Sequence, residues 1–429
     1  MSATRAQCTA DLAARQARQK VRCHRGQGLA RALLTLLCAG LATSACATSA
    51  TAERSPRRAP WAGHTIVLGA VFSTTGAGAA YGVSQRLGAN LAVDQINAAG
   101  GIRGADLRIV YENDDSNPAT SAEVTRELIT QYHALALLGP SLSDAATGAH
   151  PVADELHTVM LAVSNTGPGI VGDCSYPCQW IFRDSLGEQT AIPANIRAYA
   201  RSGHPTSAAV IYPAGDSFGL SEAQIAEQAL APNGIRLSAV VECPSSTGPV
   251  SGCVSQAIAG SPSALVVTGS SSPFLARVMV DARKQGYLGQ FLGGNTFNST
   301  STARLAGAAG QGAQSAAAWY LGNPFPANAA FVSAYQDRYH RNPDEFSAQA
   351  YTGVELLAAA IRAAPLRFRS LPADRRAVFD TLGSVRMETP LGPFNFTPSH
   401  DVEQPIWIVQ MNGVGGFRLV TSELSAVTD

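Results

Sequence analysis

Short runs of apolar residues, each followed by a small polar loop, dominate the sequence between residues 64 and 166. Such runs are typical of buried strands, and helical patterns fill the spaces between them. The predicted strands are 65–72, 107–111, 134–138 and 159–163, and the loops after them are 73–78, 113–116, 139–143 and 164–167. Alternating strands and helices predict a parallel sheet with crossover helices. Ligands bind at the carboxyl ends of the strands in such sheets, so these loops predict one half of a small-molecule site.

The same alternation begins again after Gly187. Four more apolar runs, separated by helical patterns, cover 208–212, 236–241, 264–268 and 290–293. The end of the chain differs, because runs at 392–396, 405–410 and 416–420 are joined by Gly and Asn turns. The predicted fold class is therefore α/β, with two doubly wound parallel-sheet lobes.

The N-terminus has the features of a secretory signal over residues 1–45: a basic region ending at Arg31, an apolar run and small residues before Cys46. The apolar run is too short to span a bilayer. Residues 41–46 resemble a bacterial lipobox, in which the cysteine is lipidated, although Thr43 stands where Leu is usual. The alternative is cleavage after Ala45 or Ala50 and free release. Residues 46–60 would then form a flexible tether.

Charge and cysteine content agree with export. Residues 1–45 contain seven basic residues and one acidic residue, so the remaining chain carries 24 basic and 30 acidic residues. This mildly acidic body excludes a basic nucleic-acid surface. With Cys46 accounted for by the lipid, four cysteines remain for an oxidising compartment, and three pairings are possible, of which the local pairs are simplest. A zinc site is disfavoured by the spacing of the second pair. The four are Cys174, Cys178, Cys243 and Cys253.

Six motifs, in a constant order, resemble those of the leucine/isoleucine/valine type of periplasmic substrate-binding protein. They are residues 69–76, 81–82, 92–104, 113–118, 138–143 and 216–219. The Asp-x-Ile-Asn-x-x-Gly-Gly-Ile stretch that begins at Asp94 is the most specific. The resemblance extends from about His64 to about Val409.

The resemblance implies a type I periplasmic binding protein, in which three crossing strands join two lobes that close on a ligand. The crossings would lie near Arg183, Tyr320 and Phe394. The first lobe would comprise 61–183 and 320–393, and the second 184–319 and 394–429. The expected partners are a small-molecule ligand and the permease of an ABC importer, with the membrane reached through the N-terminal lipid. The expected location is the extracytoplasmic face of the cell membrane.

The resemblance also implies ligand-binding positions. These are the aromatic Tyr81, the carboxylate-binding hydroxyl of Ser143, the turn Ser164, Asn165 and Thr166, and the second-lobe positions Phe218, Ser271 and Asn295. Asn295 stands where Glu or Asp is usual, so the ammonium half of an amino-acid site lacks its charge, and Asp144 and Asp216 are possible substitutes. The alternatives are a helix-capping role for Ser143 and core packing for Tyr81 and Phe218.

Two enzyme motifs occur in the sequence. Residues 215–219 match the G-x-S-x-G nucleophile elbow around Ser217, with His340 and His400 downstream. The glycines at 76, 78 and 82 resemble a dinucleotide fingerprint, but 73–75 separate them from the strand. We therefore predict a binding protein that uses no cofactor and no metal. The alternatives are an exported serine hydrolase and a ligand-sensing receptor module of the same fold.

Overall fold

Parallel strands form the centre of the first lobe in the computed structural model, which describes residues 59–203 and 205–423. The strand order is β2-β1-β3-β4-β5, and every neighbouring pair is parallel. The central strands are buried on both faces, as in other parallel sheets. The strands are β1 (Thr65–Val71), β2 (Asp106–Glu112), β3 (Ala136–Leu138), β4 (Met160–Ala162) and β5 (Ile181–Arg183).

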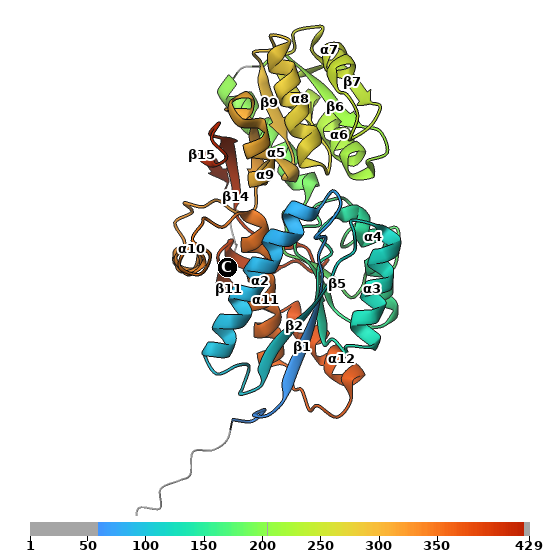
Figure 1. Ribbon diagram of the computed structural model, residues 1–429, viewed down its shortest axis with the longest axis vertical. Helices are drawn as coiled ribbons and strands as arrows, with labels where there is room; N and C mark the ends of the chain where they lie inside the picture. Colours follow the sequence, from blue (N-terminus) through green and yellow to red (C-terminus); the bar gives the residue numbers. More distant parts are fainter. Residues whose placement is uncertain (1–58, 204, 424–429) are drawn as a thin grey trace, which may run out of the picture. The chain divides into compact units, whose positions relative to one another are not determined.

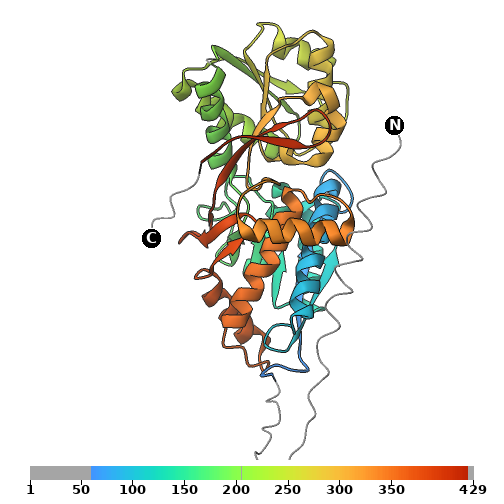
Figure 2. The same ribbon diagram turned by 90° about the vertical axis from the view of Figure 1, so that its left-hand side faces the viewer.

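Helices cover both faces of this sheet (Figure 1). On one face α2 packs against α11, and on the other α3 packs against α4. In Figure 2, α10 crosses over α11 and α2 on their outer side. A small antiparallel sheet, β11-β12-β13, completes the lobe. The bounds are α2 (Ala79–Ala98), α3 (Pro118–Thr130), α4 (Ser143–Glu155), α10 (Pro326–Tyr339), α11 (Glu345–Ala363), α12 (Leu371–Leu382), β11 (Arg386–Thr389), β12 (Gly392–Phe396) and β13 (Val402–Glu403).

The close approach of α2 to α11 depends on Gly88. A Cβ atom at this position would lie 1.9 Å from the backbone oxygen of Ser347 in α11. Only a residue without a side chain fits at that distance. The helix pair buries the largest apolar cluster of the lobe, which includes Leu91, Val354 and Leu357.

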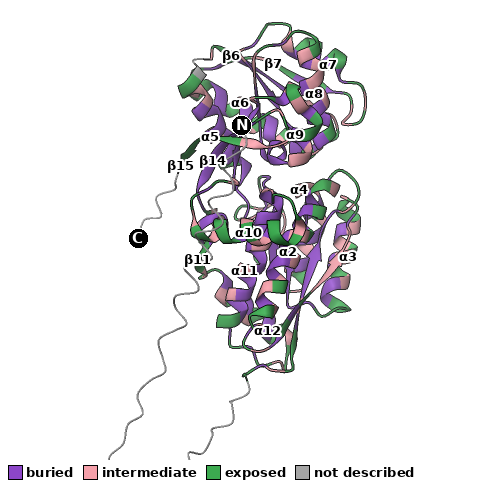
Figure 3. Cartoon of the chain, turned by 60° about the vertical axis from the view of Figure 1, so that its left-hand side comes forward, coloured by how far each residue is buried: buried purple, intermediate pink, exposed green. Residues whose placement is uncertain are grey.

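The second lobe has the sheet order β15-β14-β10-β9-β8-β6-β7. The five consecutive strands from β10 to β7 are parallel, while β14 pairs antiparallel with β10 and with β15. In both lobes the central strands are buried, and many of the exposed residues lie on helices and loops (Figure 3). The strands are β6 (Ser207–Pro213), β7 (Arg236–Cys243), β8 (Ala264–Val267), β9 (Gln290–Gly293), β10 (Gln314–Ala317), β14 (Ile406–Met411) and β15 (Phe417–Glu423).

Helices α5 and α6 pack on one face of this sheet, and α7, α8 and α9 on the other. Three short 3-10 segments follow α6, β9 and α9. The bounds are α5 (Glu188–Gly203), α6 (Ser217–Leu230), α7 (Ser251–Ile258), α8 (Ser272–Lys284), α9 (Thr300–Ala306), η1 (Ala231–Asn233), η2 (Asn295–Asn298) and η3 (Gly307–Gly310).

The chain passes between the two lobes at three places: after β5, after β10 and before β14. The first two crossings lie near Arg183 and Tyr320, where they were predicted. The third lies later than Phe394, because the rings of Phe394 and Phe396 belong to the core of the first lobe. The predicted boundary at 393/394 therefore falls inside β12, and the chain leaves the first lobe after Glu403.

Two disulfides use the four cysteines of the predicted local pairs, Cys174–Cys178 and Cys243–Cys253. The predicted signal peptide, Cys46 and nearly all of the tether lie outside the described residues. Within 59–203 and 205–423, no helix combines the length and apolar character needed to cross a membrane.

Candidate functional site

A small cavity lies where the loops of the first lobe meet those of the second. Its volume is about 20 Å³, which is room for about one water. First-lobe and second-lobe residues both contribute to its wall. The lining residues are Tyr81, Ser141, Leu142, Ser143, Asp144, Ser164, Thr166, Phe218, Ser270, Asn295, Thr296 and Phe346.

Two hydroxyls of the first-lobe wall are already engaged by a buried glutamine. Ser141 donates to Oε1 of Gln85 at 2.5 Å, and Nε2 of Gln85 donates to Ser164 Oγ at 2.6 Å. Ser164 in turn donates to the backbone oxygen of Ser141 at 2.7 Å. This network fixes the ends of β3 and β4, but it uses the protons of both hydroxyls.

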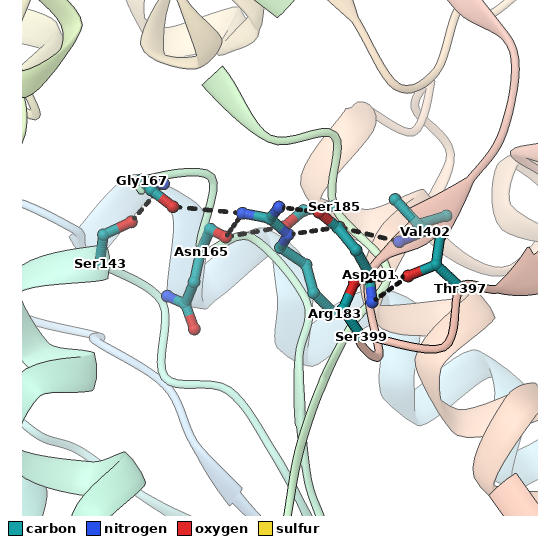
Figure 4. Close-up of polar contacts among 9 residues, drawn as sticks. All are labelled: Ser143, Asn165, Gly167, Arg183, Ser185, Thr397, Ser399, Asp401 and Val402. Carbon is teal, nitrogen blue, oxygen red and sulfur yellow. Dashed lines mark hydrogen bonds and ion pairs between the residues drawn. The ribbon is translucent and has the colours of Figure 1, made fainter. Parts of the chain in front are cut away.

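Ser143 keeps its proton free. Its Oγ accepts from the backbone N–H of Gly167 at 3.1 Å, which fixes the oxygen and leaves the hydroxyl able to donate (Figure 4). Ser143 is the first residue of α4, and Leu142 at the N-cap provides no side-chain cap. The first-turn N–H groups of α4 are thus not capped by a side chain, and a helix N-terminus favours a negative group. The alternative of a capping role for Ser143 does not hold.

Arg183 joins the same turn to the β12–β13 connection, which comes just before the third crossing. Its Nη1 donates to the backbone oxygens of Gly167 at 3.2 Å and Asn165 at 3.5 Å, and its Nε donates to Asp401 at 2.8 Å (Figure 4). The Arg183 side chain is buried and forms an ion pair with Asp401. The hinge and the turn that faces the cavity are therefore held by one guanidinium.

Three aromatic rings form the apolar part of the wall: Tyr81, Phe346 and Phe218. The rings of Tyr81 and Phe346 are stacked with centroids 4.5 Å apart. The Tyr81 hydroxyl crosses to the second lobe and donates to the backbone oxygen of Ser270 at 3.0 Å. Burial raises the pKa of Tyr81 to about 12, so this hydroxyl stays protonated and acts as a donor.

A pair of buried carboxyl groups lies directly behind the cavity. Oε1 of Glu188 accepts from the Thr166 hydroxyl at 3.0 Å and from the Asn295 backbone N–H at 2.9 Å. Oε2 of Glu188 and Oε1 of Glu222 lie within 2.8 Å and 2.0 Å of the point where a Cβ of Gly294 would be, and neither has another partner. Burial raises the pKa of Glu188 to about 7, and burial and then the Glu188 charge raise the pKa of Glu222 well above its ordinary value. We therefore expect the pair to hold one proton at neutral pH.

Asn295 holds a third buried acid. Its Nδ2 donates to Oε1 of Glu345 at 2.8 Å. Burial raises the pKa of Glu345 to about 8, so this carboxyl is mainly neutral at pH 7. Asn295 and the Glu345 carboxyl that it contacts therefore present no full negative charge to the cavity.

Asp144 and Asp216, the possible substitutes for the missing acid, differ in position. Asp216 is the N-cap of α6 and accepts from the backbone N–H groups of Gly219 at 2.8 Å and Ser270 at 2.7 Å, so its oxygens are used. Asp144 lines the cavity and accepts from the Ser217 hydroxyl. Burial raises the pKa of Asp144 from its ordinary value. Of the two, only Asp144 can face a ligand.

Six of the eight predicted ligand-binding residues line this cavity, and the structure places Asn165 and Ser271 outside its lining. The Asn165 side chain donates to the backbone oxygen of Pro140 at 2.9 Å and is fully buried. Ser271 is the N-cap of α8, and its neighbour Ser270 lies at the wall instead. The prediction missed Phe346, Thr296 and the acids behind the wall, since no local motif marks them.

Neither of the downstream histidines is a hydrogen-bond partner of the serine in the nucleophile elbow. Ser217 begins α6, and its hydroxyl contacts Asp144. The ring of His400 is stacked on Phe182 at 3.9 Å, and its Nδ1 faces the backbone oxygen of Ile181. His340 is the exposed C-cap of α10. In the described part of the chain, no group of three or more His, Cys, Asp and Glu could hold a metal ion.

Residues 65–416 match a family model whose description is periplasmic binding protein. The chain belongs to this family. The resemblance predicted from the motifs is confirmed, and the extracytoplasmic location follows from the family.

Two relatives come from Pseudomonas aeruginosa. An amino acid binding protein is 32% identical over 105 residues, which are 24% of this chain and 28% of that protein. The chain thus spans about a quarter of that relative's length. A leucine-, isoleucine-, valine-, threonine- and alanine-binding protein is 24% identical over 345 residues, 80% of this chain and 88% of that protein.

Solved structures share the two-lobe fold. A branched-chain amino acid transporter substrate binding protein from Streptococcus pneumoniae, in complex with isoleucine, has a TM-score of 0.73 and 23% identity, covering 84% of this chain and 99% of that one. An ABC transporter solute binding protein from R. palustris, in complex with benzoate, has a TM-score of 0.74 and 19% identity, covering 85% and 98%. The predicted α/β fold of this periplasmic binding protein is confirmed.

Proposed function

We propose that this chain is a solute-binding protein that closes its two lobes around a small carboxylate-bearing molecule and delivers it to the permease of an ABC importer. The observation that carries the proposal is the cavity between the lobes, with Ser143 and the start of α4 on one wall and Phe218 and Asn295 on the other. Hydrogen bonds across it, such as Tyr81 to Ser270, join the lobes.

The carboxylate of the ligand would bind at Ser143. Its hydroxyl has a free proton, and the uncapped first turn of α4 adds N–H donors and a favourable dipole. No Lys, Arg or His lines the cavity, so these neutral donors supply the attraction for the anion.

The part of the ligand away from its carboxylate would contact hydrogen-bond acceptors and aromatic rings. The Thr166 hydroxyl donates to Glu188, so toward the cavity it offers only lone pairs, and Asp144 provides the one ionisable acid of the wall. An ammonium or amide N–H can bind there, while Tyr81, Phe218 and Phe346 take an apolar part. Small amino acids, their amides and aromatic acids fit this chemistry, in keeping with the isoleucine and benzoate in the structures of similar fold.

The cavity is too small for such a molecule in the present arrangement, so binding requires the lobes to separate and close again. The three crossings provide the hinge, and ligand favours closure through contacts that the open form lacks. We also propose that Cys46 carries a lipid after removal of residues 1–45, which would hold the protein at the extracytoplasmic face of the membrane.

The proposal is tested by a thermal-shift screen of the purified protein with leucine, isoleucine, valine, their amides, the corresponding carboxylic acids and benzoate. A solute at 100 times its dissociation constant should add about 2.7 kcal/mol to the unfolding free energy. At least one carboxylate-bearing solute is expected to raise the unfolding temperature. Absence of any shift in folded protein would overturn the proposal.

A further inference from the structure

A second and much larger cavity lies beside the connection that follows β10. Its volume is about 550 Å³. Protein sites for small molecules commonly have roughly 300–1,000 Å³, so this cavity is large enough for a ligand without any movement of the lobes.

The walls of this second cavity come from both lobes. The first lobe contributes the first turns of α2 and the α10–α11 connection, and the second lobe contributes α9 with the segment before it and the β14–β15 hairpin. In both ribbon views, α10 and β15 lie on the same side of the molecule (Figures 1 and 2). The connection at 317–321 passes along the cavity. An occupant would therefore contact both lobes and the hinge.

Aromatic rings form the apolar part of this wall. Trp319, Tyr320 and Phe417 line it together with Val83. The indole N–H of Trp319 donates to Asn328 Oδ1 at 2.7 Å, so the polar atom of this ring is satisfied within the protein. Trp319 itself is buried in the core of the first lobe, so the half-buried rings of Tyr320 and Phe417 are the ones that a flat apolar group can contact.

The charged groups of the cavity are unevenly paired. Arg304 and Arg341 line it, both are exposed, and neither forms an ion pair within the described ranges. Asp344 is occupied, because it caps α11 through the backbone N–H of Ser347 and accepts from Ser84. Glu345 is buried, and its Oε2 has no hydrogen-bond partner. Two guanidinium groups thus face the cavity without a carboxylate of their own.

A partition separates this cavity from the first one. Asn295 of the first cavity donates to Glu345 of the second, and the ring of Phe346, the next residue, is stacked on Tyr81. The start of α11 therefore forms the wall between them, and each cavity can be filled separately.

We propose that the second cavity is a separate ligand site for a small aromatic monocarboxylate. The ring would lie against Tyr320 and Phe417, and the guanidinium groups of Arg304 and Arg341 would supply the charge for the carboxylate. Because the walls belong to both lobes, the bound acid stabilises their present arrangement.

The test uses indole-3-acetate as the probe, with the uncharged indole-3-ethanol for comparison, and isothermal titration calorimetry on the full protein. Indole-3-acetate is expected to bind saturably, and indole-3-ethanol at least tenfold more weakly. Ala80→Trp fills the cavity from the first turn of α2, and the double variant Arg304→Gln/Arg341→Gln removes the charge. Each is expected to weaken binding of the acid at least tenfold. Arg236→Gln, an exposed arginine on β7, is the matched control and is expected to bind as the unaltered protein does.

The two Arg positions are exposed, so their replacement keeps the test valid even if Ala80→Trp fails to fold. Absence of saturable binding, or equal binding by the double variant, would overturn the proposal. So would loss of binding in Ser143→Ala with retention in Ala80→Trp, since the acid would then occupy the first cavity. The probe reports on this site whether or not the solute screen of the proposed function succeeds.

Discussion

Arg183 and Asp401 form an ion pair that joins the first crossing to the β12–β13 connection just before the third, with the Nε of Arg183 donating to Asp401 Oδ1 at 2.8 Å. The side chain of Arg183 is 4% exposed and that of Asp401 33%. The same guanidinium donates to the backbone oxygens of Asn165 and Gly167. The pair therefore connects the hinge to the turn at the ligand cavity.

Replacement of Asp401 by Asn should destabilise the protein, because it leaves the buried Arg183 charge without its partner. Breaking a buried pair costs about 3–5 kcal/mol, and the partial exposure of Asp401 reduces this to about 2 kcal/mol. Urea unfolding measures the change. Glu155→Gln, which breaks the exposed pair with Arg126, is the control and should leave the unfolding midpoint nearly unchanged. Equal effects of the two substitutions would contradict this account.

The shared proton of Glu188 and Glu222 predicts a pH dependence of stability. A carboxyl whose folded pKa is raised contributes stability below its ordinary pKa of 4.5, and this is lost as the pH rises through the folded value. With Glu188 at about 7 and Glu345 at about 8, the unfolding free energy should fall between pH 5 and pH 7. Each group contributes about 1.4 kcal/mol per pH unit at most.

Glu222→Gln should reduce this slope, because an amide N–H can donate to Glu188 where the shared proton was. Denaturant unfolding at pH 5, 6 and 7 measures it, and the exposed Glu242→Gln is the control. His150 opposes the trend, since burial lowers its pKa to about 3 and its contribution grows as the pH rises toward 6.5. Because His150 is present in both proteins, the difference in pH slope between the variant and the unaltered protein reports the contribution of the buried acids alone. Parallel pH profiles for all three proteins would refute the shared proton.

Gly88→Ala should destabilise the first lobe. The added Cβ would meet the backbone oxygen of Ser347 at 1.9 Å, so α2 and α11 must separate. Overpacking of this kind costs about 1–3 kcal/mol or more. Gly252→Ala in α7 is the matched control, because its Cβ meets no atom within 4 Å and helix propensity favours Ala by up to about 1 kcal/mol. Thermal unfolding of the two variants should therefore shift in opposite directions, and a loss in both would count against the helix contact.

The sequence was sufficient for the strand–helix alternation and the loops of the first lobe, because apolar runs and the residues that end them are local signals. Ser143, Ser164 and Thr166 follow such runs directly, and all three line the cavity. Phe346 and Glu345 could not be found in this way. They start α11, some 200 residues later in the chain, and only the return of the chain to the first lobe brings them to the site.

The sequence predicted individual site residues less well than it predicted the elements, because the exact start of a helix and the tertiary fold decide which side chain reaches the wall. Ser271 differs from the lining Ser270 by one position, and the start of α8 decides which side chain caps the helix and which reaches the wall. The third crossing was placed too early because β12 has the apolar pattern of a sheet strand, and that pattern does not tell which lobe the strand joins.

Ser143→Ala should weaken the ligand found by the solute screen by about tenfold, the effect of losing one hydrogen bond to a charged group. Calorimetric titration measures it. Ser255→Ala, on the exposed side of α7, is the control and should leave the affinity unchanged. Equal affinity of Ser143→Ala and the unaltered protein would remove Ser143 from the site.

The most direct test is a crystal structure of the protein grown with the solute that gives the largest thermal shift. The account predicts that this solute lies between the lobes, with its carboxylate within hydrogen-bond distance of Ser143 Oγ and the first N–H groups of α4, and its apolar part against Tyr81 and Phe218. A solute bound elsewhere, or one whose carboxylate points away from Ser143, would contradict it.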